Sequence, residues 1–205
     1  CQGFSSANQQ RIIDDPRNEL YKYYIECVKK ILPKFVVMEN VRGMLKVADQ
    51  VVEDYESIKE KKNGVTYSYA VSYKLLNSLD FSVAQSRERL IYIAIRNDVA
   101  EKKDITPKAI FEEICGENED KPHYLWRDAL EYIRPLDAPR IKNTSEKDDE
   151  LTGKKIDVNS YSGNESEYLK LINEGRSIPV LFNHKARYVN DINYEIYSLL
   201  NQGDD

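Results

Sequence analysis

The sequence has no apolar run that approaches the roughly 20 residues needed to cross a bilayer, and it shows no signal peptide. We therefore expect no membrane partner and a cytoplasmic location. Cysteine and histidine are scarce: the chain has three cysteines, two histidines and no Cys-x-x-Cys pair. These counts predict no metal site. An odd number of cysteines without a secretory signal also favours reduced thiols inside the cell.

The chain also lacks an initiator methionine, an internal repeat and a glycine-rich phosphate loop. Because it begins with Cys1, we expect it to be a fragment of a longer polypeptide. Its 205 residues are 41% hydrophobic and 32% charged, which is typical of a soluble globular protein of one domain, or one domain and part of another. The net charge of −5 argues against a nucleic-acid partner only weakly, because net charge does not describe a local patch.

The first hundred residues predict alternating helices and strands, as in an α/β layered sheet. Asp15-Pro16 predicts the start of a helix that ends at Pro33. The apolar residues at helical spacing in this segment are Leu20, Tyr24, Cys27, Val28, Ile31 and Leu32. Cys27 is interpreted as a small core residue on that face. A second amphipathic helix is expected over residues 44–61, ended by a turn at Asn63-Gly64.

Three strands are predicted in the same half. Residues 35–39 begin with Phe-Val-Val-Met, which favours a strand buried on both faces, as in parallel sheets, and central in its part of the sheet. Residues 66–76 and 90–96 are rich in aromatic and β-branched types and predict two further strands. A loop is expected between them, from Asn77 to Arg89.

Beyond residue 100 the pattern changes to short helices and irregular segments. Helices are expected at residues 106–116, 125–133, 165–174 and 192–200. Residues 137–160 are polar, charged and aperiodic, which predicts a long loop. Residues 183–187 are interpreted as a polar segment that precedes the last helix.

Three segments carry residues suited to chemistry and can meet at one sheet edge: the Cys1 loop, Glu39-Asn40 and Gln85-x-Arg87-x-Arg89. An acid at the carboxyl end of a parallel strand lies where open α/β sheets bind their ligands. A cysteine thiolate is a nucleophile, and a carboxyl group can donate a proton or accept a hydrogen bond. Arginines present fixed donors to a phosphate or a ring carbonyl. Taken singly, each residue also fits an ordinary exposed position.

Together these residues carry a family resemblance. Cys1-Gln2-Gly3-Phe4-Ser5 resembles the catalytic loop of the DNA (cytosine-5) methyltransferases, without the proline that normally precedes the cysteine. Glu39-Asn40-Val41 resembles the family's Glu-Asn-Val motif, and Gln85-x-Arg87-x-Arg89 its Gln-x-Arg-x-Arg motif. Trp126-Arg127-Asp128-Ala129 and Asn183-His184-x-x-Arg187 resemble the stretch before the target recognition domain of many bacterial members.

The resemblance implies an α/β fold that is part of the Rossmann-like, S-adenosylmethionine-dependent methyltransferase fold. This chain would hold the C-terminal half of the sheet with its helices, followed by a mostly helical and irregular extension. Residues 1–99 would be the C-terminal part of the catalytic domain, and residues 100–205 would lead to the target recognition domain. S-adenosyl-L-methionine would be the cofactor, with most of its binding motifs upstream of Cys1, and duplex DNA would be the partner in a bacterial cytoplasm.

The resemblance also implies a role for each motif. Cys1 would attack carbon 6 of a cytosine flipped out of the duplex, so that carbon 5 can take a methyl group. Glu39 would contact ring N3 and the amino group, and Arg89 would hold the ring O2. Arg87 would orient the loop or a phosphate. The further substrate contacts expected are Gln2, Ser5, Asn40, Val41 and Gln85.

Two consequences follow from reading the chain as a fragment of such an enzyme. The fragment alone is expected to bind the cofactor poorly and to methylate nothing. The sheet is expected to expose the edge at which the strand leading into Cys1 would pair, so that copies of the fragment associate.

Three alternatives stay open. The enzyme could methylate cytosine in tRNA, or it could be an inactive homologue that binds DNA or regulates a partner. An unrelated thiol hydrolase would need a histidine beside its cysteine, and His123 and His184 both lie in the variable half. The sequence specifies neither the DNA site nor whether a partner nuclease completes a restriction-modification system.

Overall fold

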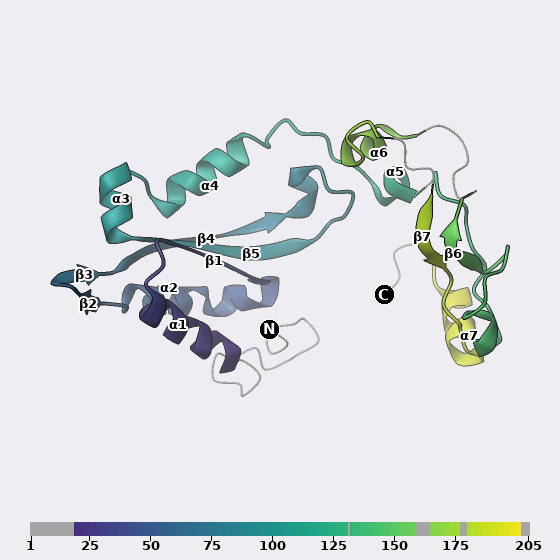
Figure 1. The fold of residues 1–205 in the computed structure, drawn as a ribbon, viewed down its shortest axis with the longest axis horizontal. Coiled ribbons are helices and arrows are strands. Elements are labelled where there is room, and N and C mark those ends of the chain that lie inside the picture. The colour runs from purple at the N-terminus through teal and green to yellow at the C-terminus, as the bar shows by residue number, and fades with distance from the viewer. Residues whose placement is uncertain (1–18, 131, 159–164, 177–179, 202–205) are drawn as a thin grey trace. The chain divides into compact units, whose positions relative to one another are not determined.

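The computed structural model describes residues 19–130, 132–158, 165–176 and 180–201 (Figure 1). The chain divides into two compact units, residues 1–124 and residues 125–205, and each is described by itself. The helix start predicted at Asp15-Pro16 lies outside the described residues. The functional division predicted between residues 99 and 100 stays a prediction. None of the described helices is both long enough and apolar enough to cross a membrane.

A three-stranded antiparallel sheet is the centre of the first unit. Its strands are β1 (Phe35–Val41), β4 (Tyr69–Asn77) and β5 (Glu88–Arg96), in the order β1-β5-β4. β5 is the middle strand and pairs antiparallel with both neighbours. The strands predicted over residues 35–39 and 90–96 are thus confirmed. The strand predicted over residues 66–76 is divided into β4 and a short preceding strand, β3 (Val65–Tyr67).

The position predicted for β1 is wrong for the sheet that the structure describes. β1 is an edge strand in the described residues and pairs antiparallel, not parallel. Its residues alternate between exposed and buried, so that Val37 is 65% exposed whereas Val36 is 6% exposed. An unbroken apolar run does not reveal this, because it fits a strand with one uncovered face as well as a strand buried on both faces.

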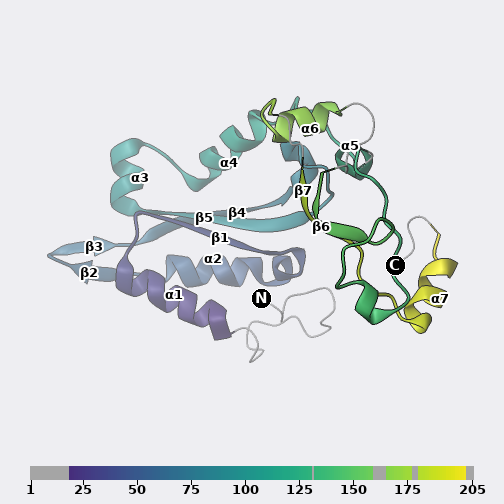
Figure 2. The same cartoon turned by 45° about the vertical axis from the view of Figure 1, so that its right-hand side comes forward.

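Helices cover the two faces of the sheet (Figures 1 and 2). α1 (Glu19–Ile31) and α2 (Ala48–Glu56) lie on one face, and α3 (Asn97–Lys103) and α4 (Pro107–Gly116) on the other. The larger core lies under α1 and α2 and includes Tyr21, Ile25, Val36, Met38, Val51, Tyr55, Leu90 and Tyr92. The smaller core lies under α3 and α4 and consists of Ile93, Ile95 and Phe111 with partly buried neighbours.

α1 is an amphipathic helix, as predicted, and Val28 and Leu32 of the predicted apolar face are buried, but the first part of its buried stripe differs from the prediction. The buried residues of this stripe are Tyr21, Ile25 and Val28. Leu20 and Ile31 are 72% and 69% exposed, and Cys27 is exposed, so the interpretation of Cys27 as a core residue is wrong. Both stripes satisfy helical spacing, and the sequence does not show which of them faces the sheet. Tyr21 belongs to the stripe that faces the sheet, and its hydroxyl donates a hydrogen bond to Asp54 Oδ2 of α2 at 2.8 Å.

The helix predicted over residues 44–61 is shorter than expected. A 3-10 segment, η3 (Arg42–Val47), precedes α2, and a hairpin of β2 (Glu60–Lys62) and β3 follows it. The turn predicted at Asn63-Gly64 is confirmed, but it joins two strands instead of ending a helix. Asn63 and Gly64 have φ values of 53° and 81°, as a two-residue type I′ hairpin turn requires.

The second unit contains a two-stranded antiparallel sheet of β6 (Gly153–Asp157) and β7 (Leu181–Lys185). Its helical segments are α5 (Trp126–Leu130), η5 (Lys142–Thr144), α6 (Glu167–Ile172) and α7 (Asp191–Leu199). The helices predicted here are thus confirmed in shorter form. The prediction of one long loop over residues 137–160 is wrong where β6 forms. The polar segment predicted over residues 183–187 does precede the last helix, and its first three residues belong to β7.

Long-range contacts explain why these two strands form in a polar sequence. Asp157, at the end of β6, is 2% exposed and accepts a hydrogen bond from Arg134 Nη2 at 2.7 Å. The backbone carbonyl of Arg134 lies 2.8 Å from His184 Nε2 of β7. Gly153 has a φ of +97°, and a Cβ atom there would lie 2.1 Å from the His184 carbonyl oxygen. The pairing of β6 with β7 therefore requires a glycine at this position.

The uncovered β1 gives the predicted self-association a direct test. Phe35 and Val37 are 50% and 65% exposed on the same face of an edge strand that carries no proline or lysine. We expect the 205-residue chain to form dimers or larger species at high concentration in light scattering. Val37→Lys should shift the mass towards the monomer, whereas Val65→Lys on β3 should not. A wild-type monomer at every concentration would refute the prediction.

Candidate active site

The carboxyl end of β1 lies beside the beginning of β5, because the two strands are antiparallel. The register pairs Glu39 with Ile91 and Val41 with Arg89. Across this pairing, Arg89 Nε lies 2.5 Å from Glu39 Oε1. The structure thus brings together the acid of one predicted motif and the last arginine of another, which are far apart in the sequence.

Both partners of this ion pair remain accessible. The Glu39 side chain is 56% exposed and the Arg89 side chain 23% exposed. Arg89 Nη1 also donates to the backbone carbonyl of Glu88 at 2.8 Å, which fixes one end of the guanidinium. An ion pair this open contributes only about 0–1 kcal/mol to stability. Its importance lies instead in placing a carboxylate next to a rigid fork of N–H donors that a ligand can reach.

Asn40 and Val41 contribute differently from their neighbour Glu39. Asn40 is only 4% exposed, and its Oδ1 accepts a hydrogen bond from the backbone N–H of Val41 at 2.9 Å. Since side chains alternate along a strand, Asn40 lies on the face opposite to Glu39. Val41 is half-buried and packs against the larger core. Both residues fix the exit from β1, and their predicted contacts with substrate stay predictions.

The Gln85-x-Arg87-x-Arg89 motif follows a 3-10 turn, η4 (Ser78–Phe81), and leads into β5. One side chain, that of Asn77, organises this connection. Its Oδ1 accepts hydrogen bonds from the backbone N–H groups of Leu79 and Arg87, both at 3.1 Å. Its Nδ2 donates to Ser86 Oγ at 3.1 Å. The backbone of Arg87 is thereby held in place while its side chain is exposed.

Gln85 is half-buried at the start of the motif. Its backbone carbonyl accepts a hydrogen bond from Ser78 Oγ at 2.5 Å, and its backbone N–H donates to Val83 at 2.7 Å. Both of these bonds hold the main chain of Gln85, and its predicted role in shaping a pocket stays a prediction.

A second ion pair lies on the other face of the same strands. Arg42 Nη1 is 2.6 Å from Glu88 Oε2. Glu88 and Arg89 are neighbours on β5 and point to opposite faces, so the end of β1 is tied to the beginning of β5 on both sides. Sequence reasoning missed Arg42 and Glu88, which fall on unassigned positions beside and within the motifs. It also missed Asn77, although an asparagine before a turn is a recognised signal for such bonds.

The remaining predicted site residues, Cys1, Gln2 and Ser5, lie outside the described residues. Their roles stay predictions.

Cys115 and His123 do not form a second candidate active site. Cys115 and His123 line one open hollow of about 650 Å³, but no hydrogen bond joins them, and His123 Nε2 lies 3.4 Å from Asp80 Oδ1. Within the described ranges, no group of three or more histidine, cysteine or acidic side chains gathers as a metal ion requires.

Comparison with known proteins identifies the class of protein to which this site belongs. The sequence model of the C-5 cytosine-specific DNA methylase family matches residues 1–204, and the chain therefore belongs to this family. The resemblance found in the three motifs is thus confirmed. The described residues form a mixed α/β structure, as predicted, while the Rossmann-like assignment of the sheet stays a prediction.

Curated relatives match about half of the chain. The Type II methyltransferase M.FnuDI of Fusobacterium nucleatum is 45% identical over 100 residues, which are 48% of this chain and 28% of that protein. M.BspRI of Lysinibacillus sphaericus is 39% identical over 104 residues, 48% of this chain and 22% of that protein. M.AquIA of a Picosynechococcus strain is 41% identical over 100 residues, 47% of this chain and 40% of that protein. The chain covers less than half of each relative.

The role of Asn77 is testable through stability. Asn77→Ala removes three hydrogen bonds from a partly buried loop and should lower the free energy of unfolding by about 2 kcal/mol in urea titrations. Asn77→Asp keeps the two acceptor bonds, and Ser86→Ala removes only the bond to Asn77 Nδ2, so both should lose less. Equal losses for the Ala and Asp variants would show that the acceptor bonds do not organise the loop.

Proposed function

We propose that the polypeptide transfers a methyl group from S-adenosyl-L-methionine to carbon 5 of cytosine in duplex DNA. The observation that carries the proposal is the Glu39–Arg89 pair, in a chain that belongs to the C-5 cytosine-specific DNA methylase family. Cytosine presents O2, N3 and an amino group along one edge. A guanidinium can donate to O2 while a neighbouring carboxyl group engages N3 and the amino group.

The reacting carbons of a paired cytosine are buried in the base stack, so the base has to leave the duplex. The exposed end of β1 and the beginning of β5 leave Glu39 and Arg89 open to such a base. In the proposal, the exposed Arg87 side chain contacts a phosphate or orients the loop. Gln85 shapes the pocket, and Gln2 and Ser5 contact the DNA.

In the proposed reaction, the Cys1 thiolate forms a bond to carbon 6, and the electron pair of the carbon 5–carbon 6 double bond moves into the ring. Glu39 stabilises the charge that builds at N3, and Arg89 the charge at O2. S-adenosyl-L-methionine supplies the methyl group that carbon 5 takes. Loss of the carbon 5 proton and expulsion of the Cys1 thiolate then restore the aromatic ring.

The described residues offer no glycine-rich loop to hold S-adenosyl-L-methionine, and we assign none of them to its binding. We therefore extend the proposal in two respects. Residues 1–205 alone bind this cofactor poorly and do not complete a turnover. The complete polypeptide acts in a restriction-modification system, which similarity to Type II methyltransferases supports.

The covalent step is tested with a duplex that carries 5-fluorocytosine at the target position. With S-adenosyl-L-methionine present, carbon 5 comes to carry both fluorine and the methyl group and has no proton to lose. The thiolate then cannot be expelled, so the adduct accumulates and is detected as a mass increase. We expect the full-length polypeptide to form the adduct, Cys1→Ser to form none, and Cys27→Ser, which alters an exposed cysteine of α1, to match the wild type. An undiminished adduct with Cys1→Ser would falsify the assignment of the nucleophile.

The role of Glu39 has its own test in the full-length polypeptide. Glu39→Gln removes the carboxyl group that stabilises the ring charge, so kcat for methylation of duplex DNA should fall by about 10²–10³. Glu53→Gln, at an exposed position of α2, serves as the matched control and should leave kcat unchanged. Faster methylation of tRNA than of duplex DNA by the wild type would favour the tRNA alternative instead.

A further inference from the structure

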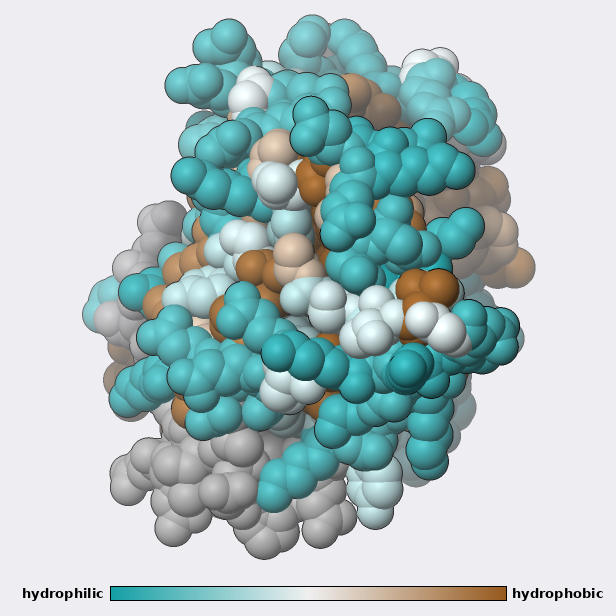
Figure 3. All heavy atoms as spheres, turned by 90° about the vertical axis from the view of Figure 1, so that its left-hand side faces the viewer, coloured by the Kyte–Doolittle hydropathy of each residue, from teal (hydrophilic) through white to brown (hydrophobic). Residues whose placement is uncertain are grey.

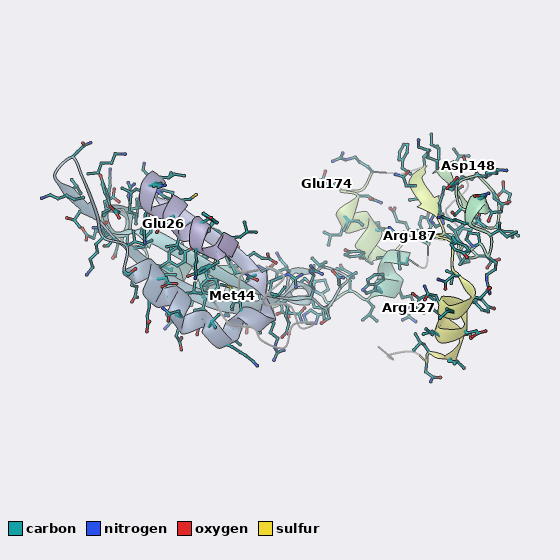
Figure 4. The ribbon with its side chains drawn as sticks, turned by 90° about the horizontal axis from the view of Figure 1, so that it is seen from below. Glu26, Met44, Arg127, Asp148, Glu174 and Arg187 are labelled. Atoms are coloured by element: carbon teal, nitrogen blue, oxygen red, sulfur yellow. The ribbon has the colours of Figure 1, made fainter. Side chains whose placement is uncertain are left out.

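Four lysines surround a hollow of about 350 Å³ between the last turn of α1 and strand β2. Its charged lining residues are Glu26, Lys29, Lys30, Glu60, Lys61 and Lys62. Figure 3 looks onto this end of the first unit and shows hydrophilic residues over most of it. In Figure 4, Glu26 lies on α1 and Met44, just beyond β1, lies towards the other end of the unit.

The hollow is separate from the candidate active site. The register of β4, β5 and β1 places the hairpin and the end of α1 beside Phe35, at the amino end of β1. Glu39 lies towards the carboxyl end of that strand. At 3.3 Å per residue, the four residues from Phe35 to Glu39 place the two regions about 13 Å apart along β1. A ligand in the hollow therefore does not compete for Glu39 and Arg89.

The lysines of the hollow are only partly neutralised. Lys29 Nζ lies 2.9 Å from Glu26 Oε1. Lys30, Lys61 and Lys62 have no ion pair or hydrogen bond to another side chain among the residues that the structure describes. Lys29 and Lys30 also complement the helix dipole at the end of α1, but Lys61 and Lys62 on β2 have no such local reason. The result is a positive patch on a protein with a net charge of −5.

The hairpin that carries Lys61 and Lys62 is anchored at its base. Asn97 Oδ1 accepts a hydrogen bond from the backbone N–H of Ser68 at 3.1 Å, and Asn97 Nδ2 donates to the Thr66 carbonyl at 3.3 Å. The Arg96 guanidinium lies 4.5 Å from the centre of the Tyr67 ring. These contacts hold β3, and through it β2, against the end of β5. Because the strand that carries these lysines is already held in place, less conformational entropy is lost when a ligand binds.

We infer that this hollow binds a phosphate-bearing anion. Lysine residues that line one cavity can attract phosphate oxygens through charge-assisted hydrogen bonds. The volume lies near the lower end of the range for small-ligand sites, which suits a compact group of phosphates. The phosphates belong either to a free polyphosphate or to the backbone of a DNA segment away from Glu39. The inference does not depend on the proposed methyl transfer.

Isothermal titration of the full chain with inorganic tripolyphosphate at low salt tests the site. Lys61→Gln/Lys62→Gln should weaken binding by about tenfold or more. Glu60→Gln removes a negative charge from the lining and should strengthen binding, which a purely structural role for the hairpin does not predict. The control Lys108→Gln/Lys121→Gln removes two exposed lysines outside the hollow and should bind as the wild type does.

A second titration distinguishes the two sources of phosphate. An A·T-only duplex contains no cytosine, so the candidate active site has no target base. If the backbone is the ligand, this duplex displaces tripolyphosphate, and the slope of log K against log salt falls by about 1–2 in the Lys61/Lys62 variant. If only tripolyphosphate binds, the ligand is a free polyphosphate.

Two results would overturn the inference: tripolyphosphate that does not bind, or binding of both ligands that Lys61→Gln/Lys62→Gln leaves unchanged. Should that variant lose its far-UV circular dichroism signal, Lys61→Arg/Lys62→Arg takes its place. It keeps both charges and should bind within about threefold of the wild type, because arginine also pairs with phosphate. A loss of binding in this folded arginine variant would likewise count against the site.

Discussion

The antiparallel pairing of β1 with β5 is the contact on which the rest of the first unit depends. It aligns residues 35–41 with residues 89–95 of the sequence, and it directs the apolar side chains of the two strands into the larger core on one face of the sheet and the smaller core on the other. It also determines which way Glu39 points. A shift of one residue would turn Glu39 into the larger core and bring Met38, now 9% exposed, into solvent. Burying an unpaired carboxylate is costly, so the apolar pattern and the charge pattern specify the same register.

The elements predicted best from the sequence are those that local signals determine. α4 begins where Thr106-Pro107 predicts, because the Thr106 Oγ1 accepts a hydrogen bond from the Ala109 N–H at 3.1 Å. β5 could be recognised from its run of branched and aromatic residues. The three motifs identified the acid and the arginine that the fold then brings within 2.5 Å of each other.

The features that the sequence did not reveal depend on distant partners. Two apolar stripes of α1 satisfy the same period, and only packing against the sheet selects the one with Tyr21. β6 and β7 lie in polar sequence and form around the buried Asp157 and a glycine at position 153. Asn77 binds backbone groups on both sides of a turn, a role that depends on how the turn folds back. Secondary-structure propensity is a property of single residues, whereas these contacts each need two residues that are far apart in the sequence, so propensity alone does not predict them.

The connectivity of the sheet has a consequence for how the chain folds. β4 and β5 are joined by a short segment, whereas α2, the hairpin and β4 separate β1 from β5 in the sequence. Closing a short loop costs less entropy, so the β4–β5 pair should form first and β1 should dock late. Folding-rate measurements would then find that truncation of Val36 mainly accelerates unfolding, whereas truncation of Leu75 slows folding. Glu39 and Arg89 would then come into contact only when β1 docks, late in folding. In a partly folded chain without that pairing, the candidate active site would not be formed.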